Sequence, residues 1–151
     1  MKKVFLMFLA VMLFAGVAFA SPVNKTIINA VQLDDDPTSV NSTTVNIQDY
    51  KETGFWLQYN ETEVGNSISA AVTVDISYDG STWLDMPFYD IAGTTTMQTT
   101  ETISSDGWYY FALPSAYFPI GSILSVRVAV AATNTDADDI LVINCYLTGT
   151  K

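Results

Sequence analysis

Strict alternation of apolar and polar residues is the feature that most constrains what this chain can fold into. Along residues 68–78 every second position is apolar or aromatic, and the positions between them carry Ser, Thr, Ala or Asp. Successive side chains of a strand point to opposite faces of a sheet, so this pattern predicts an antiparallel strand with one buried face. Residues 124–130 repeat the alternation. Residues 140–147 are apolar on both faces apart from Asn144 and are expected to lie centrally in a sheet.

Shorter runs rich in β-branched and aromatic residues bring the candidate strands to nine. The six shorter runs are residues 26–33, 43–48, 55–59, 82–86, 95–103 and 108–113. Between the runs lie turn signals such as Asp79-Gly80 and Asp106-Gly107, in which glycine accepts the positive φ of a tight turn. No helix start signal is followed by a sustained period of 3.6 residues. The expected fold is an all-β, antiparallel β-sandwich of jelly-roll or immunoglobulin-like type, with about 8–9 strands.

The first 20 residues have the three parts of a secretory signal peptide. Lys2 and Lys3 precede an apolar run over residues 4–14, and an A-x-A cleavage site at residues 18–20 precedes Ser21. We therefore expect a secreted chain that begins at Ser21 and is found in the extracellular space or at the cell surface. No second apolar stretch of about 18 residues follows, so no membrane anchor is expected.

Charge and composition exclude several classes of function. The chain has 16 acidic and 6 basic residues, and loss of Lys2 and Lys3 with the signal peptide takes its net charge from −10 to −12. Such a surface repels phosphate backbones and anionic headgroups, so neither nucleic acid nor a membrane is an expected partner. The lack of histidine excludes Ser-His-Asp and Cys-His catalysis and histidine-ligated zinc. No acidic pair stands out by its context, so the protein is not expected to be an enzyme.

The segment before residue 43 has two interpretations. Residues 21–42 combine a short strand-like run with Asp34-Asp35-Asp36-Pro37 and a stretch rich in Ser and Thr. The run could be the first strand of the sandwich, which residues 43–151 would complete. It could instead be an arm that adds to the sheet edge of a neighbouring copy.

In the arm interpretation, both faces of the segment would be buried in the neighbour. Alternation places Ile27, Val31 and Leu33 on one face and Ile28 and Ala30 on the other. The expected assembly residues are Ile27, Ile28, Val31 and Leu33. Deletion of residues 21–36 would then leave a folded monomer that cannot assemble.

The most distinctive short motif is Ser77-Tyr78-Asp79-Gly80-Ser81-Thr82-Trp83. It resembles the Asp-box hairpin of propeller hydrolases, S-x-D-x-G-x-T-W, but lacks the residue between the Asp and the Gly. It is more similar to the S-x-D-G-x-x-W hairpin of phage and cell-surface sandwich modules. The resemblance implies a structural turn in which Asp79 caps the backbone, Gly80 takes the left-handed position and Trp83 covers the hairpin.

Two acidic clusters are candidates for binding calcium. They are Asp34, Asp35 and Asp36, and Asp136, Asp138 and Asp139. Closely spaced loop aspartates can supply several of the oxygen ligands that calcium takes. Neither cluster continues as an EF-hand loop, and solvated loop charge is the alternative interpretation. No other cofactor is expected.

Aromatic residues are concentrated in a few short stretches: Trp56, Trp83, Trp108, Tyr109, Tyr110, Phe111, Tyr117 and Phe118. Alternation places Trp108 and Tyr110 on one face of a strand, and Tyr109 and Phe111 on the other. At least one of these faces must belong to the core. An exposed one could stack against sugar rings, as in carbohydrate-binding modules.

The single cysteine and three sequons complete the candidate sites. Cys145 lies in the most apolar strand and is expected to be a buried free thiol, with an intermolecular disulfide as the alternative. The glycosylation candidates are Asn24, Asn41 and Asn60, each followed two residues later by Thr.

These features favour a secreted structural protein that assembles from copies of itself into an extracellular filament, sheath or surface coat by β-strand addition. In these respects the chain is broadly similar to donor-strand filament subunits of prokaryotic surfaces. The alternative is a β-sandwich that binds a carbohydrate or another surface ligand. A binding module needs exposed coplanar rings, whereas a filament subunit needs a free edge or arm, so the position of the aromatic set discriminates between them.

Overall fold

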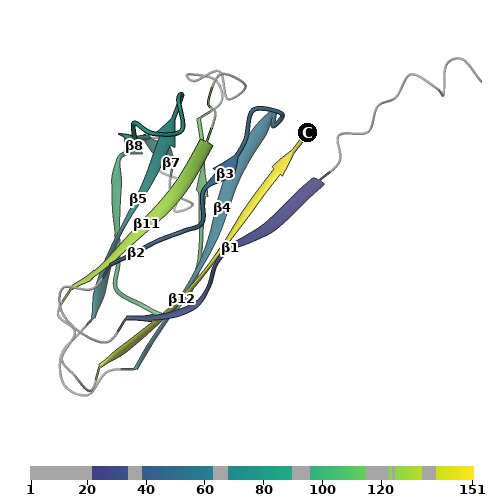
Figure 1. Cartoon of the computed structure of the whole chain (residues 1–151). Helices are drawn as coiled ribbons and strands as arrows, with labels where there is room; N and C mark the ends of the chain where they lie inside the picture. The colour runs from purple at the N-terminus through teal and green to yellow at the C-terminus, as the bar shows by residue number, and fades with distance from the viewer. Residues whose placement is uncertain are drawn as a thin grey trace, which may run out of the picture.

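The computed structural model describes residues 22–33, 39–62, 68–89, 96–114, 123, 125–133 and 139–151. Within these ranges the chain forms antiparallel strands and no helix (Figure 1). The strands make two sheets that pack face to face. This confirms the expected all-β sandwich.

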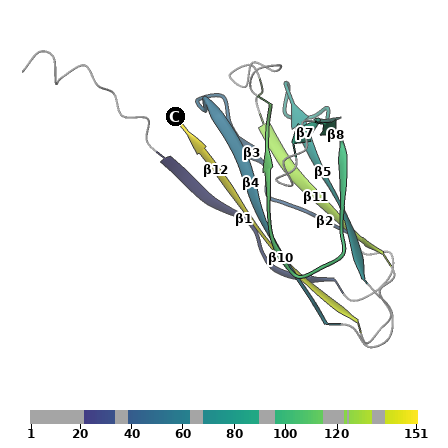
Figure 2. The same cartoon turned by 180° about the vertical axis from the view of Figure 1, so that it is seen from behind.

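The first sheet, sheet A, contains the two ends of the described chain. In spatial order its strands are β1 (Pro22–Leu33), β12 (Ile140–Thr150), β4 (Glu52–Thr62), β10 (Gly107–Ala112), β7 (Phe88–Tyr89) and β8 (Met97–Gln98). The longest of them, β1, β12 and β4, lie side by side and run along the length of the molecule (Figures 1 and 2).

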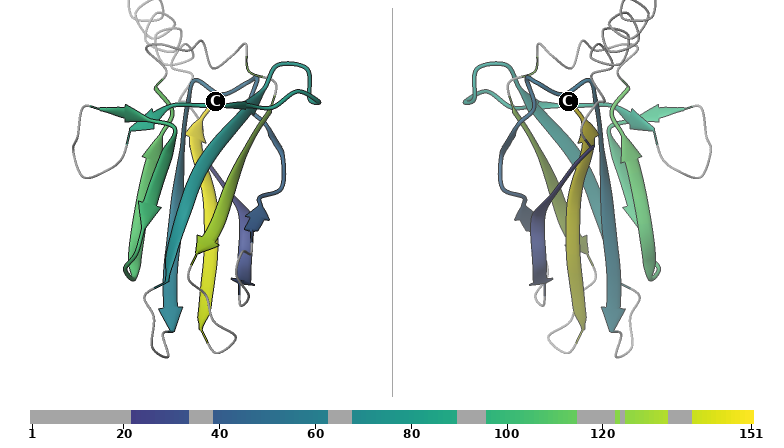
Figure 3. Two further views of the ribbon diagram at one scale, coloured as in Figure 1. Left: turned by 90° about the vertical axis from the view of Figure 1, so that its left-hand side faces the viewer. Right: turned by 90° about the vertical axis from the view of Figure 1, so that its right-hand side faces the viewer.

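The second sheet, sheet B, is built around two long strands. Its order is β2 (Ser39–Asn41), β11 (Ser125–Thr133), β5 (Ser69–Ser77) and β6 (Leu84–Asp85), with β3 (Val45–Asn46) also paired to β11 and β9 (Thr100–Ile103) to β5. Figure 3 shows that β1 and β2, from different sheets, lie at one side of the sandwich and β10 at the opposite side.

The strand count is twelve, so the expectation of 8–9 strands was too low. The strands β2 and β7 were not predicted, because runs of two or three residues are too short to show a period. The predicted strand 95–103 divides at Thr99 into β8 and β9, which belong to different sheets. The remaining predicted strands correspond to observed ones, with shifted ends.

The core lies between the sheets and follows the alternation closely. The inward residues of β5 and β11 are Ala70, Val72, Val74, Ile76, Val126, Val128, Val130 and Ala132. Those of β4 and β12 are Phe55, Leu57, Tyr59, Leu141, Ile143, Cys145 and Leu147. Each fully buried aliphatic or aromatic side chain stabilises the fold by roughly 1.5–3 kcal/mol. Tyr78 leaves this pattern and is exposed, because β5 ends at Ser77.

The N-terminal segment is the edge strand of this chain's own sheet in the structure. β1 pairs with β12 from Pro22 opposite Thr150 to Leu33 opposite Leu141. The register shifts twice, between Thr26 and Ile28 and again before Val31. In the single chain this segment is therefore the first strand of the sandwich and not a free arm.

These bulges change which side chains point inward. An extra residue in one strand rotates the following side chains to the other face. Ile27 and Ile28 are therefore both buried, although alternation had placed them on opposite faces. Leu33 is also buried, Val31 is half-buried, and Ala30 is exposed with a φ of 47°.

Candidate functional site

The outer face of sheet A carries a cluster of aromatic side chains. Trp56 on β4 lies directly opposite Tyr110 of β10 on one side and Tyr146 of β12 on the other. Trp108 lies on the same face of β10, opposite Gln58. Since directly paired residues of antiparallel strands share a face, three neighbouring strands present these rings together.

The two tryptophans are exposed, the two tyrosines are half-buried, and the rings are tilted relative to one another. Trp56 is 40% exposed and Trp108 is 52% exposed. The ring centroids of Trp56 and Tyr110 are 5.0 Å apart, with their planes at 43°. Those of Trp108 and Tyr146 are 5.8 Å apart, with their planes at 32°. The rings are therefore not coplanar, and they shape a cup rather than a flat strip.

The cup has a volume of about 420 Å³ and is lined by Asn24, Trp56, Trp108 and Tyr146. Its volume is in the range of sites that bind small molecules, and its mixed apolar and amide lining is typical of them. All four lining side chains are uncharged. Exposed rings gathered in one concave place are unusual for a surface with no binding role.

Glycine at position 54 lets Tyr110 lie across β4 beside this cup. A Cβ atom at Gly54 would stand 2.6 Å from Cζ and 2.7 Å from Cε2 of the Tyr110 ring, closer than such atoms approach in proteins. Burial raises the pKa of Tyr110, and the nearby negative charge of Glu52 raises it further. The phenol of Tyr110 therefore stays protonated at neutral pH.

A chain of amide hydrogen bonds crosses the same face next to the rings. The backbone N–H of Ala30 donates to Oδ1 of Asn144 over 2.7 Å. Nδ2 of Asn144 donates to Oε1 of Gln58 over 3.2 Å. Gln58 pairs with Asn144 of β12 on one side and with Trp108 of β10 on the other, so this series of hydrogen-bonded amides leads to the aromatic cluster.

Sequence reasoning found part of this site. It named Trp56, Trp108 and Tyr110 and correctly placed the last two on one face. It missed Gln58, Asn144 and Tyr146, although alternation in residues 140–147 puts Asn144 and Tyr146 on the face opposite Cys145. Tyr117 and Phe118 lie outside the described residues.

The Asp79-Gly80 motif is a structural turn, as its resemblance implied. Gly80 has a φ of 78°, and Asp79 Oδ1 accepts hydrogen bonds from the backbone N–H groups of Ser81 and Thr82. Asp79 Oδ2 accepts from Oγ1 of Thr82. These bonds, led by those from the backbone, hold the pKa of Asp79 well below its ordinary value. The strands β5 and β6 on either side are paired, so the turn closes a hairpin.

Trp83 is only half-buried and lies against a charged pair on sheet B. The guanidinium carbon of Arg127 is 4.3 Å from the centroid of the Trp83 ring. Arg127 Nε donates to Oδ2 of Asp75 over 2.8 Å. A cation over an indole face is attracted by the ring quadrupole, so Trp83 has a structural partner that the exposed tryptophans of sheet A do not share.

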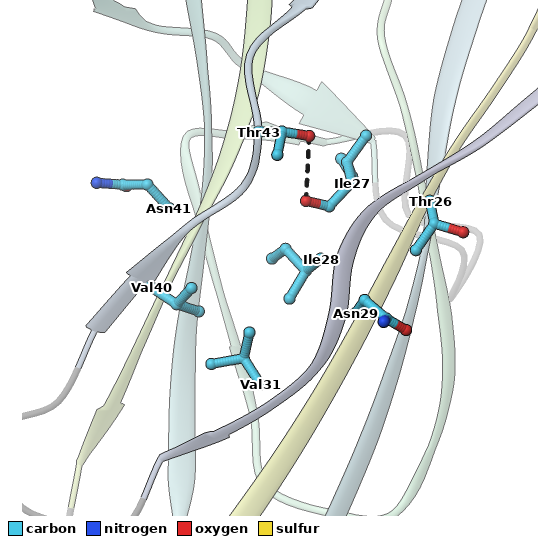
Figure 4. Close-up of a pocket in the computed structure, with 8 residues that line it drawn as sticks. All are labelled: Thr26, Ile27, Ile28, Asn29, Val31, Val40, Asn41 and Thr43. Carbon is cyan, nitrogen blue, oxygen red and sulfur yellow. Dashed lines mark hydrogen bonds between the residues drawn. The ribbon is translucent and has the colours of Figure 1, made fainter.

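A second hollow lies between the edges of the two sheets, where β1 approaches β2. Ile28, Val31 and Val40 line it, as Figure 4 shows. At its upper end in that view the carbonyl of Ile27 accepts hydrogen bonds from both the backbone N–H and Oγ1 of Thr43. This contact ties β1 to the segment that follows β2.

The remaining candidate residues are distributed as follows. Asp34, Asp35, Asp36, Asp136 and Asp138 lie outside the described residues, and Asp139 is buried. Among the described residues no three acidic or sulfur side chains gather as metal ligands do. The sequon residues Asn24, Asn41 and Asn60 are all exposed on strands.

Cys145 is a buried free thiol, as expected, and burial raises its pKa to about 12. No helix among the described residues is long and apolar enough to span a bilayer.

Comparison with known proteins gives a likeness of fold. No family model matches the chain, and no curated protein matches its sequence. The crystal structure of the SPBc2 prophage-derived protein YomS superposes with a TM-score of 0.57 at 7% sequence identity. The match covers 88% of this chain and 97% of that one. At this identity the likeness extends to the arrangement of strands alone.

Proposed function

We propose that this protein binds a carbohydrate on the outer face of sheet A, in the cup formed by Trp56, Trp108 and Tyr146. The observation that carries the proposal is the exposure of two tryptophans on one sheet face whose opposite side already supplies the core. Core packing does not account for these rings, because Phe55, Leu57 and Phe111 fill the inner face of the same two strands.

The chemistry of the cup favours a sugar over other ring-bearing ligands. The apolar face of a pyranose presents C–H groups that suit the electron-rich face of an indole, while its hydroxyls suit amides such as Asn24. Single-stranded nucleic acid also stacks on aromatic side chains, but it requires a basic groove for its backbone. This chain has a net charge of −10, and no basic side chain lines the cup.

Alanine variants of the exposed tryptophans test the proposal. Trp56→Ala and Trp108→Ala should each abolish binding of neutral hexasaccharides of glucose, mannose or galactose, measured by isothermal titration calorimetry. Because both side chains are exposed, unfolding free energies should change by about 1 kcal/mol or less.

Trp83→Ala is the matched control, since it removes the same side chain from the other sheet and should leave binding intact. Retained binding in both sheet A variants would contradict the proposal. So would a wild-type protein that binds none of the three sugars.

A second candidate is self-assembly into a filament, sheath or surface coat through exchange of β1 between copies. The observation that favours it is that β1 is an edge strand whose pairing is almost entirely with β12. The contacts of Ile27, Ile28, Val31 and Leu33 with the sandwich could be made equally by the β1 of a second copy, as in domain swapping. Each exchanged strand would then join one copy to the next.

A reversible disulfide tests this second candidate. Gln32 and Val142 are directly paired, so Gln32→Cys combined with Val142→Cys can tie β1 to its own β12. The oxidised variant should remain monomeric by light scattering at concentrations where the wild type assembles, and reduction should restore assembly. Assembly of the oxidised variant would show that the contact lies elsewhere.

A further inference from the structure

We infer that Gln58 determines the specificity of the aromatic cup, and that the ligand is a neutral oligosaccharide with an oxygen that accepts a hydrogen bond from Nε2 of Gln58. This inference rests on the proposed function and adds to it the polar contact and the charge class of the ligand. It is carried by the hydrogen-bond chain from Ala30 through Asn144 to Gln58.

This series of hydrogen bonds fixes the orientation of the side-chain amides of Asn144 and Gln58. A backbone N–H can only donate, so the atom of Asn144 that faces Ala30 is the acceptor Oδ1. Nδ2 of Asn144 must then face Gln58, whose Oε1 accepts from it. Nε2 of Gln58 consequently points away from Asn144, and the neighbour of Gln58 on that side is Trp108. Gln58 is not one of the lining residues of the cup, but its N–H donors are directed to the side of Trp108, which is.

The bulge in β1 explains how this orientation is achieved. In a regularly paired strand, backbone N–H groups that face the neighbouring strand donate to its backbone carbonyls. Because the register shifts between Ile28 and Val31, the backbone N–H of Ala30 donates to the side chain of Asn144 instead. Ala30 has a positive φ of 47°, which alanine rarely adopts. Local strain of this kind persists where the surroundings require it, and such positions concentrate at functional sites.

The charge around the cup selects a neutral ligand. The cup is lined by uncharged residues, and the chain has a net charge of −10. With no cation lining the cup, the carboxylates of an acidic sugar would meet the repulsion of this net charge and no compensating partner. Hydroxyl oxygens, in contrast, pair well with an amide donor.

Gln58→Glu is the sharpest test, because it keeps the oxygen that Asn144 contacts and replaces only the donor group. We expect this variant to bind the preferred neutral hexasaccharide at least about tenfold more weakly than wild type, as loss of one hydrogen bond to the ligand implies. Gln48→Glu is the matched control, since it makes the same amide-to-carboxylate change at an exposed position outside the strands of sheet A. It should bind as wild type does. Hexagalacturonate should bind at least tenfold more weakly than the neutral sugar at low ionic strength.

The outcomes separate this inference from the proposed function. If Trp108→Ala abolishes binding while Gln58→Glu binds as wild type does, the cup binds sugar but Gln58 does not select it. Equal affinity for hexagalacturonate would also overturn the inference. Failure of every neutral hexasaccharide to shift the indole N–H signals of Trp56 and Trp108 in NMR spectra would overturn both.

Discussion

The contribution of β1 to the stability of a single chain gives the most direct test of the fold. Ile28 is 3% exposed and Leu33 is 1% exposed, and both belong to the hydrophobic core. Truncation of such residues to alanine typically costs about 2–5 kcal/mol, because transfer free energy is lost and a cavity remains. Ile28 also lines the hollow beside Val40, where neighbours can relax, so its cost should be near the lower end. Leu33 does not line that hollow, and its cost should be higher.

Urea unfolding monitored by circular dichroism measures these costs on samples shown to be monomeric. We expect a loss of about 2–3 kcal/mol for Ile28→Ala and about 3–5 kcal/mol for Leu33→Ala. The double variant would lose most of the roughly 5–15 kcal/mol that stabilises a typical domain. Gln32→Ala, at an exposed position of the same strand, should change stability by less than about 0.5 kcal/mol. Monomers of both core variants that unfold like the wild type would refute the reasoning, because β1 would then make its contacts outside its own chain.

The remaining predictions concern the deletion of β1, the hairpin and the cysteine. Deletion of residues 21–36 should leave a chain without the cooperative unfolding transition of the wild type, whereas deletion of a separable arm would leave a folded monomer. A sharp thermal unfolding transition of the deletion variant would contradict this prediction. Gly80→Val should destabilise by at least about 1 kcal/mol in urea unfolding, because its φ of 78° strains a β-branched residue. The difference in unfolding free energy between wild type and Asp79→Asn should be constant above about pH 5 and should become smaller as the pH falls below 3.8, the ordinary pKa of this carboxyl group. The reason is that a carboxyl group whose pKa is lowered in the folded state stabilises the fold only while it is ionised. A difference that does not change with pH down to 2 would show that the ionised Asp79 does not stabilise the turn. Trp83→Ala should cost about 1–2 kcal/mol rather than the 3–5 of a fully buried ring, since Trp83 is half-buried against Arg127. Cys145 should react with a thiol reagent at pH 8 only at the rate of unfolding, because it is buried and its pKa is raised to about 12; rapid labelling of the native protein would show an accessible thiol.

Much of the fold could be predicted from periodicity, because burial of one face of a strand makes every second residue apolar, and this alternation is visible in the sequence. Residues 68–76 show it, and their inward apolar face is placed correctly, although Tyr78, which continues the pattern, is exposed. For residues 108–113 the alternation separates the two faces correctly but does not decide which of them is inward. The Asp79-Gly80 turn was also predictable, since its hydrogen bonds are local and its glycine is required by backbone geometry.

The features that escaped prediction depend on contacts between distant segments. A bulge leaves no local signal, so the inward position of Ile28 and the turned N–H of Ala30 follow only from pairing with β12. Asp106-Gly107 was predicted to be a tight turn with a positive φ at the glycine. Among the described glycines only Gly80 has a positive φ, and β9 and β10 on either side of Asp106-Gly107 belong to different sheets. Likewise the aromatic cup requires the four strands β1, β12, β4 and β10 to be in register, and no single stretch of sequence contains that information.

The place of β12 between β1 and β4 governs when this chain can fold. Its partners in sheet A occur early in the sequence and do not pair with each other, and Ala30 meets Asn144 across a separation of 114 residues. Closing so long a loop costs entropy before any pairing compensates for it, and proteins dominated by such distant contacts fold in milliseconds to seconds. During synthesis the backbone edges of β1 and β4 that pair with β12 remain unpaired until β12 emerges. A ribosome stalled before residue 140 should therefore hold a chain that proteases still cleave freely, however much of sheet B is already present.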